Sequence, residues 1–185
     1  MSKRLFITHG YMAYPGKHWF PWLKEQLSPL GVEVTILKMP NPDKPILEEW
    51  IATIQENVKQ PDTETYFIGH SLGCIATLQY LNTLNIVTGG TILVAGFDQK
   101  IKELPELNNF VTPPLNYTKL QEQATPFIVF GSPQDYIVPF SMTQKLANSL
   151  EAELISIPNA GHFMQDDGFL VFPQILDVVK KVMHL

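Results

Sequence analysis

The chain contains little cysteine: its 185 residues include a single one, Cys74. One thiol cannot form an internal disulfide, and this cysteine content is typical of a reducing compartment such as the cytoplasm. One cysteine and five scattered histidines also argue against a structural zinc site. We therefore expect no metal site, and the chemistry inferred below requires no organic cofactor.

The chain also has few charged residues and no long apolar run. Charged side chains make up 17% of the sequence, acidic ones outnumber basic ones by 18 to 13, and no stretch of lysine and arginine occurs. These features argue against a nucleic-acid or anionic-membrane partner. The start, Met-Ser-Lys-Arg-Leu-Phe-Ile-Thr, contains no signal-peptide apolar region, and no segment approaches membrane-spanning length. We expect a single cytoplasmic domain covering residues 1–185.

Glycine-rich nucleotide-binding motifs are absent as well. The sequence has neither Gly-x-Gly-x-x-Gly nor Gly-x-x-x-x-Gly-Lys, and the pair Gly89-Gly90 precedes an expected strand instead of following one. This argues against a nucleotide-binding doubly wound domain.

What the sequence does contain is an alternation of strand-like and helix-like segments. Several strand-like runs are continuously apolar, which is typical of parallel strands buried on both faces. The alternation predicts an α/β fold with about six parallel strands and helices on both faces, and ligands in such sheets bind beyond the carboxyl ends of the strands. The expected strands are Arg4–Thr8, Glu33–Lys38, Thr65–Ile68, Thr91–Ala95, Phe127–Phe130 and Glu153–Ile157; the expected helices are Trp19–Leu30, Ile46–Lys59, Leu72–Leu84, Ser141–Leu150 and Phe172–Met183.

One long stretch, Asp98–Thr125, fits neither pattern and is rich in proline, asparagine and leucine. Two interpretations remain open. It is either a small cap over a site or an irregular crossover that contains a short helix.

The candidate nucleophile follows the third expected strand. Residues 69–73 read Gly-His-Ser-Leu-Gly and stand between that strand and a helix, which is the pattern of a nucleophile elbow. The tight turn would lift the Ser71 hydroxyl above the sheet, and the two glycines would let helix and strand approach closely. The alternative is a glycine turn whose serine only caps the helix.

An activated serine needs a base, and only two histidines follow it in the chain. His184 is the penultimate residue and is interpreted as a solvated cation. His162 comes directly after the last expected strand, within Pro-Asn-Ala-Gly-His-Phe, and is the candidate base.

The candidate acid is Asp135, which comes shortly after the fifth expected strand. One helix and one strand separate it from His162, so both side chains should return to the same edge of the sheet. Asp98, at the end of the preceding strand, is the main alternative. Asp166 and Asp167, just past the histidine, are further alternatives.

The oxyanion hole should combine backbone N–H groups from two loops. One is the N–H of Leu72, the residue after the nucleophile. The other comes from the loop after the first strand, with Tyr11 as first choice and Gly10 as second. We expect His9 to support this loop and, more weakly, to border the pocket, whereas His18 is interpreted as packing at a helix start.

Aromatic and apolar residues on the loops at the same edge are weaker candidates for the substrate pocket. They would favour an apolar acyl or alcohol group, although ordinary packing is an alternative for each. These candidates are Tyr11, Trp19, Phe97, Phe110, Phe163 and Met164.

Taken together, these motifs resemble the small YdeN-like serine hydrolases, a group that includes retinoblastoma-binding protein nine. The resemblance is carried by Lys-His-Trp-Phe-Pro-Trp-Leu at 17–23, Val-Thr-Ile-Leu-Lys-Met-Pro-Asn-Pro at 34–42, the Gly-His-Ser-Leu-Gly elbow and the closing Gly-His-Phe at 161–163. It runs over essentially the whole chain. It implies a minimal α/β-hydrolase fold with little or no lid, the triad Ser71, Asp135 and His162, and esterase- or amidase-like activity towards small substrates.

The retinoblastoma-binding motif Leu-x-Cys-x-Glu does not carry over. The only cysteine lies in Leu72-Gly-Cys74-Ile-Ala76, with alanine where the motif requires glutamate. The sequence therefore gives no reason to expect that protein partner.

The functional hypothesis is a serine hydrolase that cleaves small esters, or activated amides, through an acyl-enzyme. Hydrolysis should rise with pH as the catalytic histidine loses its proton. The alternatives are a thioesterase or aminopeptidase-like enzyme on the same triad, a lipase, against which the missing lid argues, and a binding module that retains the fold without turnover.

Overall fold

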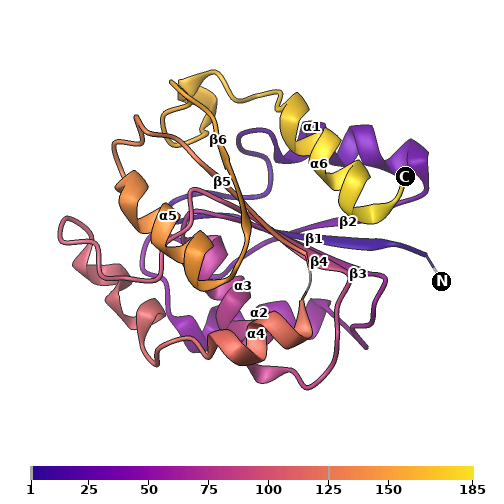
Figure 1. The fold of residues 1–185 in the computed structure, drawn as a ribbon, viewed down its shortest axis with the longest axis horizontal. Helices are drawn as coiled ribbons and strands as arrows, with labels where there is room; N and C mark the ends of the chain where they lie inside the picture. Colours follow the sequence, from indigo (N-terminus) through magenta and orange to yellow (C-terminus); the bar gives the residue numbers. More distant parts are fainter. Residues whose placement is uncertain (1, 125) are drawn as a thin grey trace.

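The computed structural model describes residues 2–124 and 126–185 and contains a six-stranded sheet (Figure 1). The strand order is β2-β1-β3-β4-β5-β6, and every neighbouring pair is parallel. This confirms the parallel sheet predicted from the alternation of segments. The strands are β1 (Arg4–Thr8), β2 (Glu33–Leu37), β3 (Thr65–His70), β4 (Gly90–Val94), β5 (Phe127–Gly131) and β6 (Glu153–Ser156).

Helices cover both faces of the sheet, and each face has its own apolar core (Figure 1). Neighbouring strand residues point to opposite faces, so Phe67 packs on one side and Ile68 on the other. Helices α1 (Phe20–Leu27) and α6 (Pro173–Met183) cover one face. Helices α2 (Leu47–Asn57), α3 (Leu72–Thr83), α4 (Tyr117–Gln123) and α5 (Phe140–Ser149) cover the other.

The central strands are buried throughout, whereas the edge strands are not. Every residue of β3, β4 and β5 is buried, while the edge strands β2 and β6 also contain exposed residues. Helix α3 is buried over most of its length, as expected of a helix that is apolar on all sides. The strand-to-helix turn between β3 and α3 therefore lies in the most rigid part of the molecule.

The segment after β4 combines features of both interpretations offered by the sequence. It contains a 3-10 turn, η2 (Pro105–Val111), followed by the short helix α4, which leads into β5. Leu107 and Phe110 pack into the core, while Glu103 and Leu104 border the cavity described below. The segment is thus a crossover that also forms part of a cavity wall; its last residue, Thr125, lies outside the described residues.

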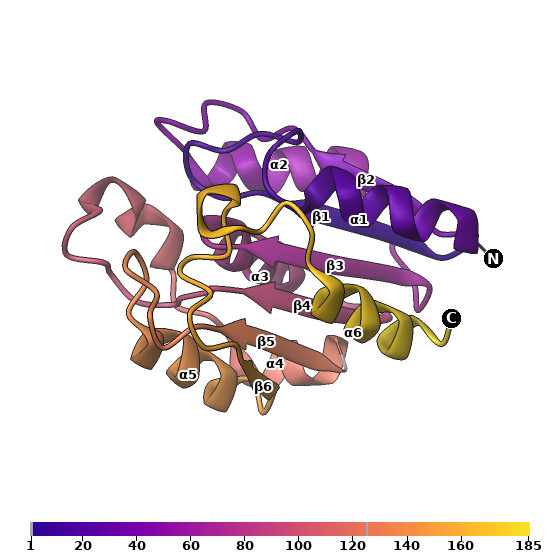
Figure 2. The ribbon, with the colours of Figure 1, turned by 90° about the horizontal axis from the view of Figure 1, so that it is seen from above.

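The strand order places a crevice at the carboxyl edge of the sheet. From β1 the chain moves outward to β2 and then returns to form β3 on the other side of β1. The loops after β1 and β3 consequently leave in opposite directions, which opens the crevice where ligands bind in such sheets. Figure 2 shows the strand arrowheads pointing to this end, away from the two termini.

Two shorter 3-10 turns complete the chain: η1 (Ser28–Leu30) follows α1, and η3 (Gln165–Asp167) follows β6. Among the described residues, no helix combines the length and the apolar character that crossing a membrane requires.

Candidate active site

Ser71 occupies the turn between β3 and α3 in a strained backbone conformation. Its φ is 53° and its ψ is −120°, a combination that favours glycine and is uncommon for a residue with a side chain. Its N–H donates to the Val94 carbonyl at 2.9 Å, and its own carbonyl accepts the Cys74 N–H at 2.9 Å. These bonds hold the strained turn in place, as expected of an elbow that presents a nucleophile.

The two glycines of the elbow are required by close backbone contacts. A Cβ at Gly69 would lie 2.6 Å from the Cα of Cys74, and a Cβ at Gly73 would lie 2.1 Å from the carbonyl oxygen of Thr8. Any side chain at either position would therefore push helix α3 away from the sheet. The glycines act through close packing, as the Gly-x-Ser-x-Gly pattern predicts.

His162 and Asp135 form a buried, hydrogen-bonded pair. The Nδ1–H of His162 donates to Oδ2 of Asp135 at 2.8 Å, and the two side chains are 3% and 2% exposed. The other carboxylate oxygen of Asp135 accepts the backbone N–H groups of Ile137 and Val138, each at 2.9 Å. Because the proton is held on Nδ1, Nε2 is left as the basic nitrogen of the ring.

The other acidic candidates lie in different surroundings. Asp98 accepts hydrogen bonds from the Tyr117 hydroxyl and the Gln99 side chain. Asp167 accepts the backbone N–H groups of His162 and Met164 at 2.9 and 3.1 Å, so it shapes the loop that carries the histidine. Asp166 is exposed and lies in the wall of the larger cavity described below.

His184, the other histidine after the elbow, is exposed and ends helix α6 in a left-handed backbone conformation. His184 therefore takes no part in the buried His162–Asp135 pair.

Tyr136 links the acid and histidine loops. Its hydroxyl donates to Oδ1 of Asp167 at 3.2 Å, while the neighbouring residue in the chain is Asp135 itself. Gly161 allows this arrangement, because a Cβ there would lie 2.3 Å from the Asp167 carboxylate. The two loops are thus joined both by the His162–Asp135 pair and by the Tyr136–Asp167 hydrogen bond.

Two adjoining cavities open at this edge of the sheet. The larger has a volume of about 760 Å³, within the range of small-molecule binding sites. The smaller has a volume of about 60 Å³ and contains Ser71 and His162 in its wall. Six residues border both cavities: Tyr11, Ala13, His18, Leu104, Ile137 and Met164.

The remaining walls differ in character. The small cavity is completed by residues that are all buried, namely Gly10, His70, Ser71, Leu107 and His162. The large cavity is completed by Met12, Lys17, Glu103, Asp135, Tyr136, Pro139, Gln165 and Asp166, several of which are exposed at its rim. The small cavity therefore forms the floor of the large one.

His70 and His18 surround the reacting groups as neutral imidazoles. The Nε2–H of His70 donates to the carbonyl of His162 at 2.9 Å, and burial lowers the His70 pKa well below its ordinary value. The Nδ1 of His18 accepts the Gln165 N–H at 3.1 Å, and burial, assisted by Lys17, lowers the His18 pKa to about 4. Neither ring adds positive charge beside His162 at neutral pH.

The loop after β1 approaches the nucleophile closely. A Cβ at Gly10 would lie 3.1 Å from the Cβ of Ser71, closer than most Cβ atoms approach a neighbour, so the backbone of this loop lies almost against the serine. Within the described residues, no hydrogen-bond acceptor is paired with the N–H of Leu72 or Tyr11. Both groups are thus free to bind an oxyanion.

His9 supports this loop from below. Its Nδ1–H donates to the Gly10 carbonyl at 2.9 Å, and its Nε2 accepts the Met39 N–H at 3.2 Å. The side chain is buried, and burial lowers its pKa. His9 borders neither cavity, so its weaker assignment to the pocket is corrected, while the supporting position expected for it is the one observed.

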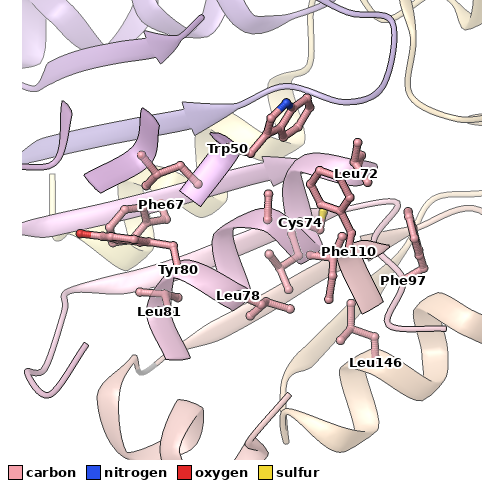
Figure 3. Close-up of a cluster of buried hydrophobic side chains, with 14 of the residues drawn as sticks. Trp50, Phe67, Leu72, Cys74, Leu78, Tyr80, Leu81, Phe97, Phe110 and Leu146 are labelled. Atoms are coloured by element: carbon pink, nitrogen blue, oxygen red, sulfur yellow. The ribbon is translucent and has the colours of Figure 1, made fainter. Parts of the chain in front are cut away.

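Four aromatic candidates for the pocket wall lie in the core instead. Phe97 and Phe110 point into the cluster around Cys74 and α3 (Figure 3). Trp19 donates its indole N–H to the Phe163 carbonyl at 3.2 Å, and both rings pack against Phe172. All four are at most 1% exposed and border neither cavity, because large apolar rings next to a sheet are drawn into its core. Tyr11 and Met164 do border both cavities.

The sequence alone does not single out several residues that border the two cavities. His18 packs against Phe20 at the start of α1, as expected, and in addition borders both cavities with a φ of 55°. Its left-handed backbone conformation is a functional signal that the sequence did not reveal. Leu104, Leu107 and Ile137 are ordinary apolar residues in irregular segments, and nothing in their local sequence distinguishes wall from core.

Groups of three or more histidine, cysteine or acidic side chains arranged to hold a metal ion do not occur in the described part of the chain. Cys74 is buried, and burial raises its thiol pKa far above the ordinary value, so it is a packing residue.

Comparison with known proteins places this arrangement in a family. A family model described as serine hydrolase matches residues 5–181. The chain is 40% identical over 181 residues to the YdeN hydrolase of Bacillus subtilis, covering 97% of this chain and 95% of that protein. It is 26% identical over 178 residues to the serine hydrolase RBBP9 of Rattus norvegicus, covering 95% of this chain and 88% of that protein.

Solved structures agree with this placement. The crystal structure of the B. subtilis ydeN gene product matches with a TM-score of 0.96 and 39% identity over the full length of both chains. Est1E from Butyrivibrio proteoclasticus, solved with ferulic acid bound, matches with a TM-score of 0.76 at 16% identity, covering 97% of this chain and 87% of that one. At that identity the likeness shows the shared fold alone.

These matches confirm the α/β-hydrolase fold and the resemblance to YdeN-like proteins expected from the sequence. The family model spans nearly the whole chain, and the B. subtilis relative exceeds a third identity over nearly its full length. The chain belongs to the serine hydrolase family.

Proposed function

We propose that this serine hydrolase cleaves carboxylic esters, or activated amides, by acyl transfer to Ser71. The observation that carries the proposal is the small cavity. Its wall contains both Ser71 and His162, and the Nδ1–H of that histidine is held by the buried carboxylate of Asp135. The proposed nucleophile and base thus share the wall of one cavity, and the proposed acid holds the base from outside it.

In the first half-reaction, Nε2 of His162 takes the Ser71 proton while the hydroxyl oxygen attacks the substrate carbonyl carbon. The resulting tetrahedral species carries its negative charge on the former carbonyl oxygen. As it collapses, the bond to the leaving oxygen or nitrogen breaks, and His162 gives that atom its proton. The alcohol or amine leaves, and the acyl group remains as an ester of Ser71.

In the second half-reaction, water takes the place of the leaving group. His162 removes a proton from the water as its oxygen attacks the acyl carbon, and then returns the proton to the Ser71 oxygen. The carboxylic acid is released, and the free enzyme is restored. Throughout, Asp135 keeps the proton of the ring on Nδ1 and stabilises the imidazolium that forms.

The oxyanion is assigned to the N–H of Leu72 and that of Tyr11, with Gly10 as the alternative on the same loop. Leu72 begins helix α3, where unpaired N–H groups and the helix dipole favour negative charge. The loop after β1 lies against Ser71, as the Gly10 contact shows. Preorganised donors of this kind lower the barrier by about 3 to 4 kcal/mol each.

A fluorophosphonate probe tests the proposal directly, because it loses fluoride to an activated serine and remains attached. The protein, Ser71→Ala and the matched hydroxyl control Ser132→Ala would be incubated with it, and intact mass and peptide mapping would locate the adduct. We expect one adduct on Ser71 in the parent and in the Ser132 variant. No adduct should form on Ser71→Ala.

A substrate panel then separates the acyl-transfer classes. Ester, thioester and aminoacyl-amide substrates with a common acyl group would be compared by kcat/KM. We expect turnover of the ester, and its loss in Ser71→Ala. A folded parent protein that forms no adduct and turns over no member of the panel would contradict the proposed function and favour a binding role.

A further inference from the structure

The two adjoining cavities differ in size by more than tenfold, at about 60 and 760 Å³. A substrate carbonyl must sit beside Ser71, in the small cavity, and has two substituents that need space. The two substituents therefore meet spaces of very different size, because the large cavity adjoins the small one along six shared wall residues. The site is therefore built for a substrate whose two halves are unequal in size, an inference that rests on the proposed function.

The small cavity has room for few atoms. A volume of about 60 Å³ corresponds to roughly four to six water-sized spheres, since one such sphere needs about 10–15 Å³. Two of these places are needed for the carbonyl carbon and its oxygen. The rest suffices for a short aliphatic group and not for an aromatic ring.

The walls of the small cavity cannot easily give way. Leu107 is 2% exposed and packs into the core formed with α3, and His70 is held by its hydrogen bond to the His162 carbonyl. On the far side, Gly10 lies against Ser71. Densely packed interiors of this kind resist expansion, so a long chain would have to displace several groups at once.

The order of the two half-reactions indicates which half of the substrate lies in which cavity. The leaving group departs while Ser71 still carries the acyl group, so its path to solvent must not pass through that group. The large cavity provides such a path, because its rim residues Met12 and Tyr136 are 62% and 65% exposed. A leaving group held in the small cavity would be trapped behind the acyl-enzyme.

The chemistry of the large cavity suits a bulky, mainly apolar leaving group. Its wall includes Met12, Leu104, Ile137, Pro139 and Met164. The wall also includes the charged or polar side chains of Lys17, His18, Glu103, Asp135, Gln165 and Asp166, but apolar atoms make up the larger part of its surface. Such a surface binds a large apolar body and adds a small number of orienting contacts.

We propose that the enzyme acts on esters of a short aliphatic acyl group and a bulky, largely apolar alcohol. The volume of the small cavity limits the acyl group to about two to four carbons. Leu107 sets the acyl-length limit from the floor, and the open cavity admits the alcohol. The site is a short-chain acyl esterase site.

Two isomeric esters test which half lies where. Benzyl acetate has a small acyl group and a large alcohol, methyl phenylacetate has the reverse, and their alkoxide leaving groups are similarly basic. We expect kcat/KM of the parent protein to favour benzyl acetate by at least about tenfold, the discrimination that a few methylene-sized steric differences produce.

A pair of leucine variants tests the role of the floor. Leu107→Ala enlarges the small cavity, whereas Leu120→Ala removes an equally buried leucine of the same core that borders neither cavity. With 4-nitrophenyl esters from acetate to octanoate, Leu107→Ala should move the preferred acyl length upward by about two carbons or more. Leu120→Ala should leave the preference unchanged. Leu107→Val replaces Leu107→Ala if thermal melting shows that the alanine variant is unfolded.

The outcomes separate this inference from the function on which it rests. Equal use of the two isomers, or preference for methyl phenylacetate, would overturn the assignment while leaving the hydrolase mechanism intact. An unchanged chain-length profile in a folded Leu107 variant would overturn the role given to the floor. If the parent protein hydrolyses no ester at all, the proposed function itself fails and this inference fails with it.

Discussion

The loops at the two ends of the sheet differ in backbone strain. At the carboxyl end, several residues with side chains have positive φ: Met12, His18, Asn41, Ser71, Ala95, Asn159 and Phe163. At the amino end, the corresponding loops contain only Gln60 and Glu151 of this kind within the described residues. Each such residue stores about 1 to 3 kcal/mol where its conformation is sparsely populated. The reactive edge therefore depends on the rigid strands below it to maintain a costly arrangement.

Individual glycines also differ in how closely other atoms approach them. At the carboxyl end, Gly69 and Gly73 have neighbouring backbone atoms within 3 Å of where a Cβ would be. At the amino end, Gly31 lies in open space, and glycine is favoured there only because φ is positive. The elbow glycines and Gly89, whose Cβ would lie 2.5 Å from the Thr63 carbonyl oxygen, serve close packing, whereas Gly31 serves a turn. Four substitutions test this contrast, and they follow from the largest expected effect to the smallest.

Ser71→Gly should abolish ester hydrolysis while leaving the fold more stable than Ser71→Ala does. Removal of the nucleophile should lower kcat by about a millionfold. Because glycine adopts φ 53°, ψ −120° without strain, Ser71→Gly should be about 1 kcal/mol more stable than Ser71→Ala, which loses the hydroxyl and keeps the strain. Ester hydrolysis and urea unfolding of both variants measure this. Equal stabilities would show that the elbow is not strained.

Asp135→Asn should lower kcat by about 10⁴-fold, because an amide no longer stabilises the correct histidine tautomer and its cation. Steady-state ester hydrolysis is the measurement. Asp98→Asn is the matched control, since Asp98 follows the preceding strand and bonds to Tyr117. Its kcat should change by less than about tenfold. The reverse result would move the acid one strand earlier.

Gly73→Ala should destabilise the fold by at least about 3 kcal/mol, because its Cβ would meet the Thr8 carbonyl and force α3 from the sheet. Gly31→Ala, at φ 80° in open space, should cost only about 1 kcal/mol. Chemical unfolding of both variants compares a packing glycine with a turn glycine directly. Similar losses would refute the distinction between packing and turn glycines.

His18→Asn should make the stability of the fold depend less steeply on pH below about 6.5. The His18 pKa is about 4 in the folded protein and 6.5 when unperturbed, so between these pH values the unfolded chain takes up a proton that the folded one refuses. Stability from this group is therefore present above pH 6.5 and is lost as pH falls towards 4. Asparagine tolerates the positive φ at this position.

The slope of melting temperature against pH, from 7 to 4.5, measures the effect of His18→Asn. The exposed His184 provides the control. His184→Asn should reproduce the slope of the parent protein, while His18→Asn should give a shallower one. A parent-like slope in His18→Asn would show that His18 is free to ionise in the fold.

Much of the fold was predictable because its signals are local. The continuous apolar runs at residues 65–68 and 127–130 predicted buried parallel strands, and both strands are observed, extended by one or two residues. Helix α4 was anticipated only as one alternative, since Tyr117–Gln123 has too few turns to show a periodicity. The last residue of that segment lies outside the described residues.

Prediction was less successful for the walls of the site. Of the residues expected at the substrate pocket, Tyr11 and Met164 border the cavities, whereas Phe97 and Phe110 lie in the core around α3. A loop position at the active edge leaves open which way a ring points, and that is decided by the space left between helices. His18 packs against Phe20 at the start of α1, as expected, but its place in the cavity walls is also set by its contact with Gln165, far away in the chain.

The sequence by itself determined the parallel α/β architecture, the turn at Ser71 and the chain order of the candidate residues Ser71, Asp135 and His162. These follow from local patterns: hydrophobic periodicity, glycine spacing and residues placed directly after strands. Only the tertiary structure decided the partners of Asp98 and Asp167, the neutral state of His18 and the unequal cavities that meet at Ser71. Those properties depend on burial and on distances between segments remote in sequence, which local patterns do not encode.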